Sequence, residues 1–284
     1  MLKFSRRDFL KRTGRGAAAA ALVPGTAAAL LSGRSVPAEA GGGRLRLGMA
    51  SYTFREFGRE DTILMTKRLG LTHIAFKSFH LALESTPDQI REVVSRVKDA
   101  GLDLYGGGVI YMKDRSEVER AFAYAKAAGM RVIIGVPNPE LIPLVEEKIK
   151  STDIRVAIHN HGPGDDMYPT PQVAYDRIRT RDARFGLCVD VGHTQRAGVD
   201  PAESILKLAD RVLDVHIKDV SAASAKGGTI EIGRGVIDIP EVCRALQEIE
   251  FGGIVSFEFE KDGKDPLAGV AESIGYVRGV LATL

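Results

Sequence analysis

Short apolar runs alternate with amphipathic stretches along most of this chain. Eight of these runs are rich in β-branched and aromatic residues and are bounded by polar or glycine-containing segments, which is the pattern of strands. Val132-Ile133-Ile134 is apolar at every position, as expected for a parallel strand buried on both faces. The predicted strands span residues 45–52, 73–77, 102–110, 131–136, 155–160, 185–191, 212–218 and 254–259.

The stretches between these strands predict helices. Thr86 is placed to cap a helix whose first turn contains Pro87 and which continues to Ala100, before a stop at Gly101. A second amphipathic stretch, residues 116–128, ends at a glycine in the same way. Regular alternation of strand and helix predicts a parallel sheet covered by helices.

Chain length and topology together favour a single (β/α)8 TIM barrel of the α/β class over residues 41–284. Without the first 40 residues the chain has 284 − 40 = 244 residues, close to the roughly 250 typical of one such barrel. A doubly wound open sheet is the alternative. The nucleotide-binding versions of that fold lose support because neither a GxGxxG motif after the first strand nor a Walker-type loop is present.

The N-terminal segment reads as a targeting signal. Arg6-Arg7 precedes an alanine-rich apolar run at residues 17–31, and residues 38–40 form an Ala-x-Ala cleavage pattern. We therefore predict a twin-arginine signal peptide over residues 1–40, export by the twin-arginine machinery, and a periplasmic or extracytoplasmic location. A membrane anchor is the alternative, but Pro24-Gly25 interrupts the apolar run, which is short for a span of about 20 residues.

Charge and cysteine content narrow the class of partner. The whole chain carries +2; the first 40 residues contain seven Lys/Arg and two Asp/Glu, so the remainder is near 2 − 5 = −3. A mildly acidic domain lacks the basic surface of a nucleic-acid-binding protein. We expect a small carbohydrate as ligand, and the sequence is compatible with a homo-oligomer. Cys188 and Cys243 lie in a strand-like and a helix-like run, so no disulfide framework is expected.

Ligand-type side chains gather where the predicted strands end. Five of the six histidines and several acids are placed there, and a (β/α)8 barrel collects its catalytic groups at this end of the strands. Taken alone, each has a structural explanation, such as a hydrogen-bonded histidine or a capping aspartate. Charges at the ends of apolar strands are costly unless paired or bound to a cation. We therefore predict one divalent metal held by His159, Asp190, His216 and Glu258.

Two nitrogen and two carboxylate ligands restrict the choice of ion. Ca²⁺ prefers oxygen ligands alone, whereas Mn²⁺, Co²⁺, Fe²⁺ and Zn²⁺ accept mixed sets. We expect Mn²⁺ first, with Co²⁺, Fe²⁺, Mg²⁺ or Zn²⁺ as alternatives.

The ordered motifs carry a family resemblance. The chain beyond residue 40 resembles the xylose isomerase-like barrel superfamily, which contains sugar phosphate isomerases and epimerases, ketose 3-epimerases, hydroxypyruvate isomerase, inosose dehydratase and endonuclease IV. The motifs that carry the resemblance are His159-Asn160-His161, Asp190-Val191-Gly192-His193, His216-Ile217-Lys218-Asp219, Gly233-Arg234-Gly235 and Glu258-Phe259-Glu260. It implies metal ligands from the last four strands, which fall on the four residues named above. His193 matches a residue that binds substrate oxygen in the epimerases.

One position departs from the epimerase pattern. In ketose 3-epimerases the ligand on the fifth strand is a Glu that also serves as one of two opposed bases, whereas this chain has His159, with His161 two residues later. We therefore do not expect a symmetrical exchange between two carboxylates. The His-x-His pattern is closer to inosose dehydratase, which makes elimination of water next to a carbonyl an alternative reaction.

The resulting hypothesis is a metal-dependent isomerase or epimerase of a keto-sugar or sugar derivative. The metal would polarise a keto or hydroxyl oxygen, Glu258 would remove the neighbouring proton, and His193, His161 or Lys218 would return one. A dehydratase or lyase acting on an inosose or a 3-keto-glycoside is the alternative.

Further residues are placed to contact substrate. These candidates are His80, Glu56, Arg234 and Glu260, with Tyr111 as a weaker one. The long loop after the seventh predicted strand, with Gly227-Gly228, is read as a lid, and we do not infer a phosphorylated substrate from the family label.

Two other protein classes share part of this pattern. Endonuclease IV shares the Asp-x-x-His spacing but needs three zinc ions and a later Asp-x-His motif, and no histidine follows His216 here. A sugar-binding barrel without turnover would keep the histidines yet could lose Glu258. The presence of Glu258 therefore favours an enzyme.

Overall fold

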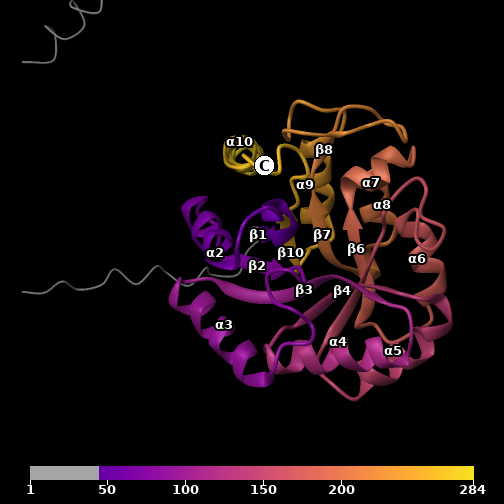
Figure 1. Ribbon diagram of the computed structural model, residues 1–284. Coiled ribbons are helices and arrows are strands. Elements are labelled where there is room, and N and C mark those ends of the chain that lie inside the picture. The colour runs from indigo at the N-terminus through magenta and orange to yellow at the C-terminus, as the bar shows by residue number, and fades with distance from the viewer. Residues whose placement is uncertain (1–44) are drawn as a thin grey trace, which may run out of the picture. The chain divides into compact units, whose positions relative to one another are not determined.

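Eight parallel strands close into a barrel in the computed structural model, which describes residues 45–284 (Figure 1). Around the barrel the order is β1-β10-β7-β6-β5-β4-β3-β2. The (β/α)8 fold predicted from the sequence is thus confirmed, whereas the predicted signal peptide lies outside the described residues. The barrel strands are β1 Arg46–Ala50, β2 His73–Phe76, β3 Asp103–Met112, β4 Val132–Pro137, β5 Arg155–His159, β6 Phe185–Asp190, β7 Val212–Ile217 and β10 Ile254–Phe257.

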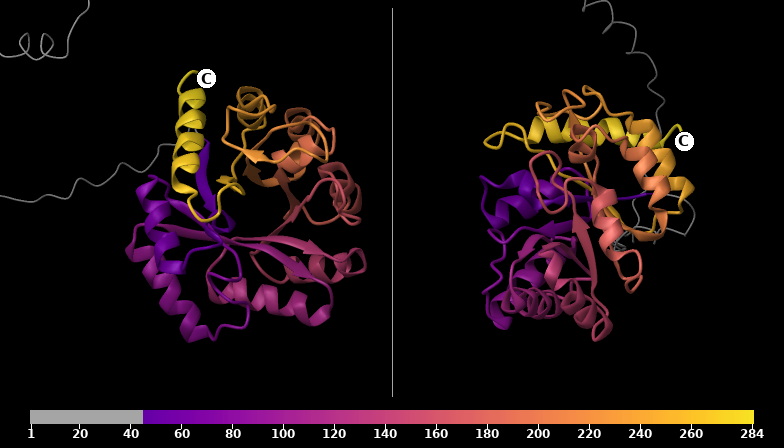
Figure 2. Two further views of the ribbon diagram at one scale, coloured as in Figure 1. Left: turned by 45° about the horizontal axis from the view of Figure 1, so that its top comes forward. Right: turned by 90° about the vertical axis from the view of Figure 1, so that its right-hand side faces the viewer.

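Helices surround the strands, as both views in Figure 2 show. Their ends follow local chemistry. Thr86 caps α3 in a capping box with Gln89, and the residue after the C-cap of α4, Gly129, has a φ of +65°, which favours glycine. The helices are α2 Arg59–Arg68, α3 Pro87–Asp99, α4 Arg115–Ala127, α5 Ile142–Lys150, α6 Pro171–Ile178, α7 Val191–Arg196, α8 Pro201–Lys207, α9 Ile239–Glu248 and α10 Leu267–Leu281, with 3-10 turns η1 Ser51–Phe54, η2 Pro139–Leu141 and η3 Ala209–Arg211.

The predicted strands agree with the observed ones to within about two residues at each end. Two features were not predicted. The 3-10 turn η1 takes the end of the first predicted strand, and the loop after β7 contains a small antiparallel hairpin, β8 Asp219–Val220 with β9 Thr229–Ile230. This loop lies beyond the end of β7 in Figure 1.

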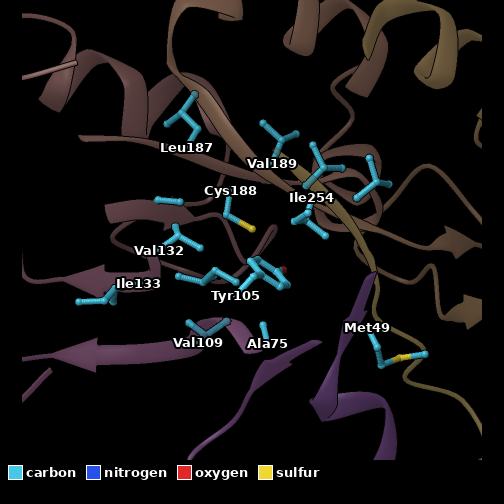
Figure 3. Close-up of a cluster of buried hydrophobic side chains, with 14 of the residues drawn as sticks. Met49, Ala75, Tyr105, Val109, Val132, Ile133, Leu187, Cys188, Val189 and Ile254 are labelled. Carbon is cyan, nitrogen blue, oxygen red and sulfur yellow. The ribbon is translucent and has the colours of Figure 1, made fainter. Parts of the chain in front are cut away.

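The core has two layers, one between strands and helices and one inside the barrel. Residues paired in register on parallel strands point to the same face of the sheet. Val132 and Arg155 therefore point to one face, and within a second pair His216 and Ser256 also point the same way. Tyr105 stands in the cluster of buried side chains drawn in Figure 3, and its hydroxyl lies 2.6 Å from Ser256 Oγ. Cys188 and Cys243 are buried free thiols, as expected.

Within residues 45–284 the longest apolar helices fall short of what a bilayer crossing requires.

Thr53 ties the first strand region to the last. Its hydroxyl donates to Phe257 O (3.2 Å) and accepts from Phe259 N–H (3.0 Å), and its side chain is fully buried. The two backbone groups flank Glu258, so this hydroxyl fixes the chain on either side of that carboxylate.

We expect Thr53→Val to lower the free energy of unfolding by about 1–3 kcal/mol, because a buried carbonyl and a buried N–H lose their partner. Urea titration followed by circular dichroism measures the change. Thr72→Val, at an exposed position, is the matched control and should change stability by about 0.5 kcal/mol or less. Equal stability of the Thr53 variant and the unmutated protein would contradict this role.

Candidate metal centre

Four buried side chains meet where consecutive strands of the barrel end. His159 closes β5, Asp190 closes β6, His216 lies near the end of β7, and Glu258 directly follows β10. Asp190 pairs in register with His216, and His216 pairs with Ser256, two residues before Glu258. Strand register therefore brings together residues that are up to 99 positions apart (258 − 159) in the sequence.

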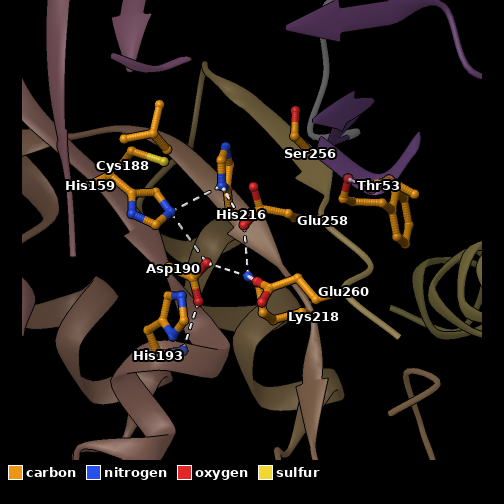
Figure 4. A network of polar contacts seen from close by, with 12 residues as sticks. Thr53, His159, Cys188, Asp190, His193, His216, Lys218, Ser256, Glu258 and Glu260 are labelled. Atoms are coloured by element: carbon orange, nitrogen blue, oxygen red, sulfur yellow. Dashed lines mark hydrogen bonds and ion pairs between the residues drawn. The ribbon is translucent and has the colours of Figure 1, made fainter. Parts of the chain in front are cut away.

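Their ligand atoms face one another (Figure 4). His159 Nε2 lies 3.1 Å from His216 Nδ1 and 3.4 Å from Asp190 Oδ2, and His216 Nδ1 lies 3.2 Å from Glu258 Oε2. One nitrogen or oxygen from each of the four residues lies within 4.8 Å of all the others. Two imidazole nitrogens and two carboxylate oxygens form the kind of donor set that holds a divalent cation.

A histidine binds a metal ion through a neutral ring nitrogen, and the pKa values of the two histidines shift in opposite directions. Burial lowers the pKa of His159 to about 3, although Asp190 opposes the shift, so this imidazole is neutral and offers a lone pair. Burial also disfavours the His216 imidazolium, but Glu258, Asp214 and Asp190 together raise its pKa above the ordinary value. A cation in their midst would replace that proton.

Both carboxylates are ionised despite their burial. Burial raises the pKa of Asp190 and of Glu258, but the Lys218 ammonium and the neighbouring histidines lower both below the usual range. Lys218 Nζ lies 2.9 Å from Asp190 Oδ2 and 2.7 Å from Glu258 Oε2, and it also contacts Glu260 Oε1. Within residues 45–284, Asp190 Oδ2 nevertheless receives no hydrogen bond of good geometry. That buried oxygen fits a metal ligand.

Asp190 performs a second task with its other oxygen. Oδ1 accepts the His193 backbone N–H at 2.7 Å and caps α7, while Oδ2 faces the centre. One carboxylate oxygen of Asp190 therefore caps the helix, and the other remains available as a ligand. Gly192 leaves room for the Lys218 side chain, because a Cβ there would lie 2.4 Å from Lys218 Cγ.

A polar network continues beneath the centre. His216 Nε2 lies 4.0 Å from Asp214 Oδ1, and the Cys188 thiol donates to the same oxygen at 3.5 Å. Burial raises the pKa of Asp214 to about 7. Cys188 also lies close enough to His159 and His216 to form a three-residue ligand group with them. The 4.0 Å separation is an ion-pair distance and no hydrogen bond, and this carboxylate beside Nε2 would favour the ring orientation in which His216 Nδ1 faces the centre.

A cavity of about 180 Å³ opens over the centre. His161 lies in its wall, with Nδ1 3.1 Å from Asp165 Oδ2 and Nε2 3.2 Å from the Tyr111 hydroxyl. Two groups of residues line this cavity, one from the first three strand ends and one from the ligand side: Tyr52, Lys77, Val109 and Tyr111, and His159, His161, His193, Glu258 and Glu260.

Six of the predicted catalytic or substrate-contacting residues surround this cavity or the carboxylates beneath it, namely Tyr111, His161, His193, Lys218, Glu258 and Glu260. Three others lie elsewhere. The His80 ring is enclosed by Ser51 Oγ, Thr62 Oγ1 and Phe57 O, Glu56 is exposed outside the lining, and Arg234 forms a two-pronged ion pair with Glu272 on α10. A position at or after the end of a strand did not predict substrate contact for these three residues, because it does not determine where the side chain points.

Several residues around the centre were not singled out from the sequence. Lys77 ends an apolar strand, which was an available signal, and its ammonium donates to Val109 O at 2.5 Å. Burial lowers its pKa, and Glu258 opposes that shift. Tyr52, Asp165 and Asp214 carried no comparable signal, because their roles come from contacts between distant segments.

Asp219 organises the loop after β7. Its carboxylate accepts the backbone N–H groups of Gly233 and Gly235 at 3.0 Å each and of Ile237 at 3.2 Å. A Cβ on Gly235 would lie 2.1 Å from Asp219 Oδ1, so this close approach requires glycine. The backbone of the Gly233-Arg234-Gly235 motif therefore stabilises the conformation of its own loop through Asp219.

Comparison with known proteins gives one family and several similar chains. A family model described as xylose isomerase-like TIM barrel matches residues 63–280. An inosose dehydratase from Lacticaseibacillus casei is 24% identical over 131 residues, which cover 41% of this chain and 44% of that protein. The chain thus spans less than half the length of the curated relative it matches.

Solved structures share the fold at low identity. The IOLI protein with a binding zinc atom superposes with a TM-score of 0.70 and 16% identity, covering 84% of this chain and 99% of that one. The structure of L-ribulose 3-epimerase gives a TM-score of 0.67 and 18% identity, covering 84% and 95%.

We expect Lys218→Met to destabilise chelator-treated protein by about 3–5 kcal/mol, because Asp190 and Glu258 would lose their buried ammonium partner. Urea unfolding monitors the change. Lys126→Met, on the exposed face of α4, is the control and should leave stability nearly unchanged. If both variants unfold at the same urea concentration as the unmutated protein, the ammonium does not hold the two carboxylates.

Asp214→Ala should weaken divalent-metal binding by about 10–100-fold, because His216 would lose the group that orients its ring. Asp214→Asn keeps an acceptor oxygen and should weaken it less. Competition with a chromophoric chelator measures the affinity, with Asp103→Ala, on the half-buried start of β3, as control. An unchanged affinity in Asp214→Ala would contradict the orienting role.

Proposed function

Because this chain belongs to the xylose isomerase-like TIM barrel family, we propose that it is a divalent-metal-dependent isomerase or epimerase of a keto-sugar or sugar derivative. One observation carries the proposal: two buried imidazoles and two buried, ionised carboxylates converge within 4.8 Å beneath an open cavity. His159, Asp190, His216 and Glu258 would hold the ion. Its proposed identity is Mn²⁺, with Co²⁺, Fe²⁺, Mg²⁺ or Zn²⁺ as alternatives.

When bound, the ion supplies a Lewis acid that polarises a substrate carbonyl and lowers the pKa of the adjacent C–H. The protein supplies the proton transfers. Glu258 is ionised and lines the cavity, so its carboxylate can accept the proton. Lys218 Nζ, 2.7 Å from Glu258 Oε2, stabilises the carboxylate between transfers.

Return of a proton falls to groups on the other walls of the cavity. His161 and His193 both line it, and the imidazole of His161 lies between the Tyr111 hydroxyl, 3.2 Å from Nε2, and Asp165 Oδ2, 3.1 Å from Nδ1. Because His159 replaces the second carboxylate of the epimerases, a histidine would act as the partner of Glu258 in this chain. Lys77, at the cavity wall, would bind a substrate oxygen.

A second candidate is a dehydratase acting on an inosose or a 3-keto-glycoside. The same proton abstraction starts this reaction, after which hydroxide leaves from the neighbouring carbon. His159 in place of Glu and the similarity to an inosose dehydratase support it.

We also propose that the protein is exported by the twin-arginine machinery to the periplasm or another extracytoplasmic space. Arg6-Arg7 and the apolar run at residues 17–31 support this. Export of a folded protein would allow the metal to be loaded before translocation.

The proposal is tested by incubating metal-loaded protein in D₂O with keto-sugars, inososes and 3-keto-glycosides. We expect deuterium next to the substrate carbonyl, without loss of water, as measured by NMR and mass spectrometry. Glu258→Gln should lower the exchange rate by about 10²–10⁴-fold, because the proton acceptor is lost. An enone product would instead establish the dehydratase.

Two controls make the result specific. Metal content is measured for every variant, because Glu258 is also a proposed ligand, and Glu56→Gln removes a carboxylate outside the cavity lining and should exchange normally. Unmutated protein that holds metal yet exchanges no proton with any of these compounds would contradict the proposal and favour a sugar-binding barrel without turnover.

A further inference from the structure

We propose that a second cavity beside the metal centre binds an anionic group of the substrate, a carboxylate or a phosphate, through Arg196. This inference deepens the proposed function and rests on it for the location of the reacting carbons. The cavity has a volume of about 290 Å³ and lies where the loops after β6, β7 and β10 meet. Its lining includes His193, Arg196, Lys218, Glu260 and Lys261.

The lining is dominated by positive charge. Arg196, Lys218 and Lys261 face it, against the single carboxylate of Glu260. Both lysines already have acidic partners, since Lys218 contacts three carboxylates and Lys261 Nζ lies 2.8 Å from Glu231 Oε1. In the described part of the chain, Arg196 has no carboxylate within 4.0 Å. Its charge is the one that the protein leaves without a counter-ion in this cavity.

Neutral groups hold the Arg196 guanidinium in place. A guanidinium only donates, so the 3.2 Å contact of Nη1 with His193 Nδ1 makes that ring nitrogen the acceptor. Nη2 donates to Ala225 O at 3.1 Å in the loop after β7. Nε is buried and has no hydrogen-bond partner within residues 45–284. Nη1 and Nη2 each carry a second N–H beyond the bond already made, since a guanidinium has five N–H donors. A fixed, partly enclosed cation with such unused donors is suited to a carboxylate or phosphate oxygen.

The location connects this cavity to the reaction. His193 and Glu260 line both cavities, so an anionic group near Arg196 leaves the rest of the same molecule over the metal centre. Barrels of this class often bind phosphate in the loops after the last two strands, which here are β7 and β10. The Gly233-Arg234-Gly235 segment is not the anion site, because Asp219 already occupies two of its N–H groups. The substrate class is therefore a keto-sugar derivative carrying a carboxylate or a phosphate.

The test uses purified full-length protein treated with chelator, so that neither metal nor turnover enters the result. Inorganic phosphate and malonate are titrated separately by calorimetry at constant ionic strength. We expect saturable binding of at least one, and the tighter anion identifies the group. Arg196→Gln should weaken it by about 10–100-fold, since charge-assisted hydrogen bonds are lost. Arg196→Lys, which keeps the charge but not the two-pronged geometry, should weaken it less.

Arg234→Gln is the matched control, because it removes the same charge from an exposed arginine paired with Glu272, and it should bind like the unmutated protein. Folding of each variant is checked by circular dichroism. A second test needs no variant. In the unmutated protein the bound anion should protect Arg196 from modification by phenylglyoxal, and mass spectrometry identifies the modified arginines. No saturable binding of either anion, unweakened binding in Arg196→Gln, or no protection would overturn the proposal. Failure here with proton exchange intact would leave the proposed reaction standing.

Discussion

Two carboxylates buried at one end of a closed barrel are the constraint on which the rest of the structure depends. Asp190 and Glu258 are ionised beneath a small cavity, and burial alone would disfavour that charge. Cationic partners must offset the cost. Lys218 contacts Asp190 Oδ2 and Glu258 Oε2, the two oxygens that face the centre. One nitrogen each of His159 and His216 lies beside these oxygens. The arrangement suits a divalent ion, with Lys218 as the cation that the chain itself provides.

The same constraint links local structure to chemistry. Asp190 caps α7 with one oxygen, which places His193 at the edge of the cavity and fixes the start of the helix that carries Arg196. Thr53 bridges the backbone on either side of Glu258. Positive charge is distributed in two places, with Lys218 beneath the centre and Arg196 beside it. We interpret the first as neutralising the protein's own carboxylates and the second as meeting a substrate anion.

Much of this could be predicted from the sequence, for identifiable reasons. Buried parallel strands are continuous apolar runs, so all eight appeared, and ligand-type residues at strand ends marked one edge of the barrel. Side-chain direction and contacts between distant loops leave no such pattern. His80 follows a strand as His161 does, yet its ring packs against Ser51 and Thr62. Asp214 and Arg196 gain their roles only from the fold, through residues on other segments.

The central claim is that His159, Asp190, His216 and Glu258 hold one divalent ion. Diffraction from crystals grown with Mn²⁺, collected at the manganese absorption edge, tests it most directly. The account predicts one strong anomalous peak within bonding distance of all four side chains, with Lys218 turned toward Glu260. Absence of a peak among these four residues, or a fully occupied ion bound elsewhere on the barrel, would contradict it.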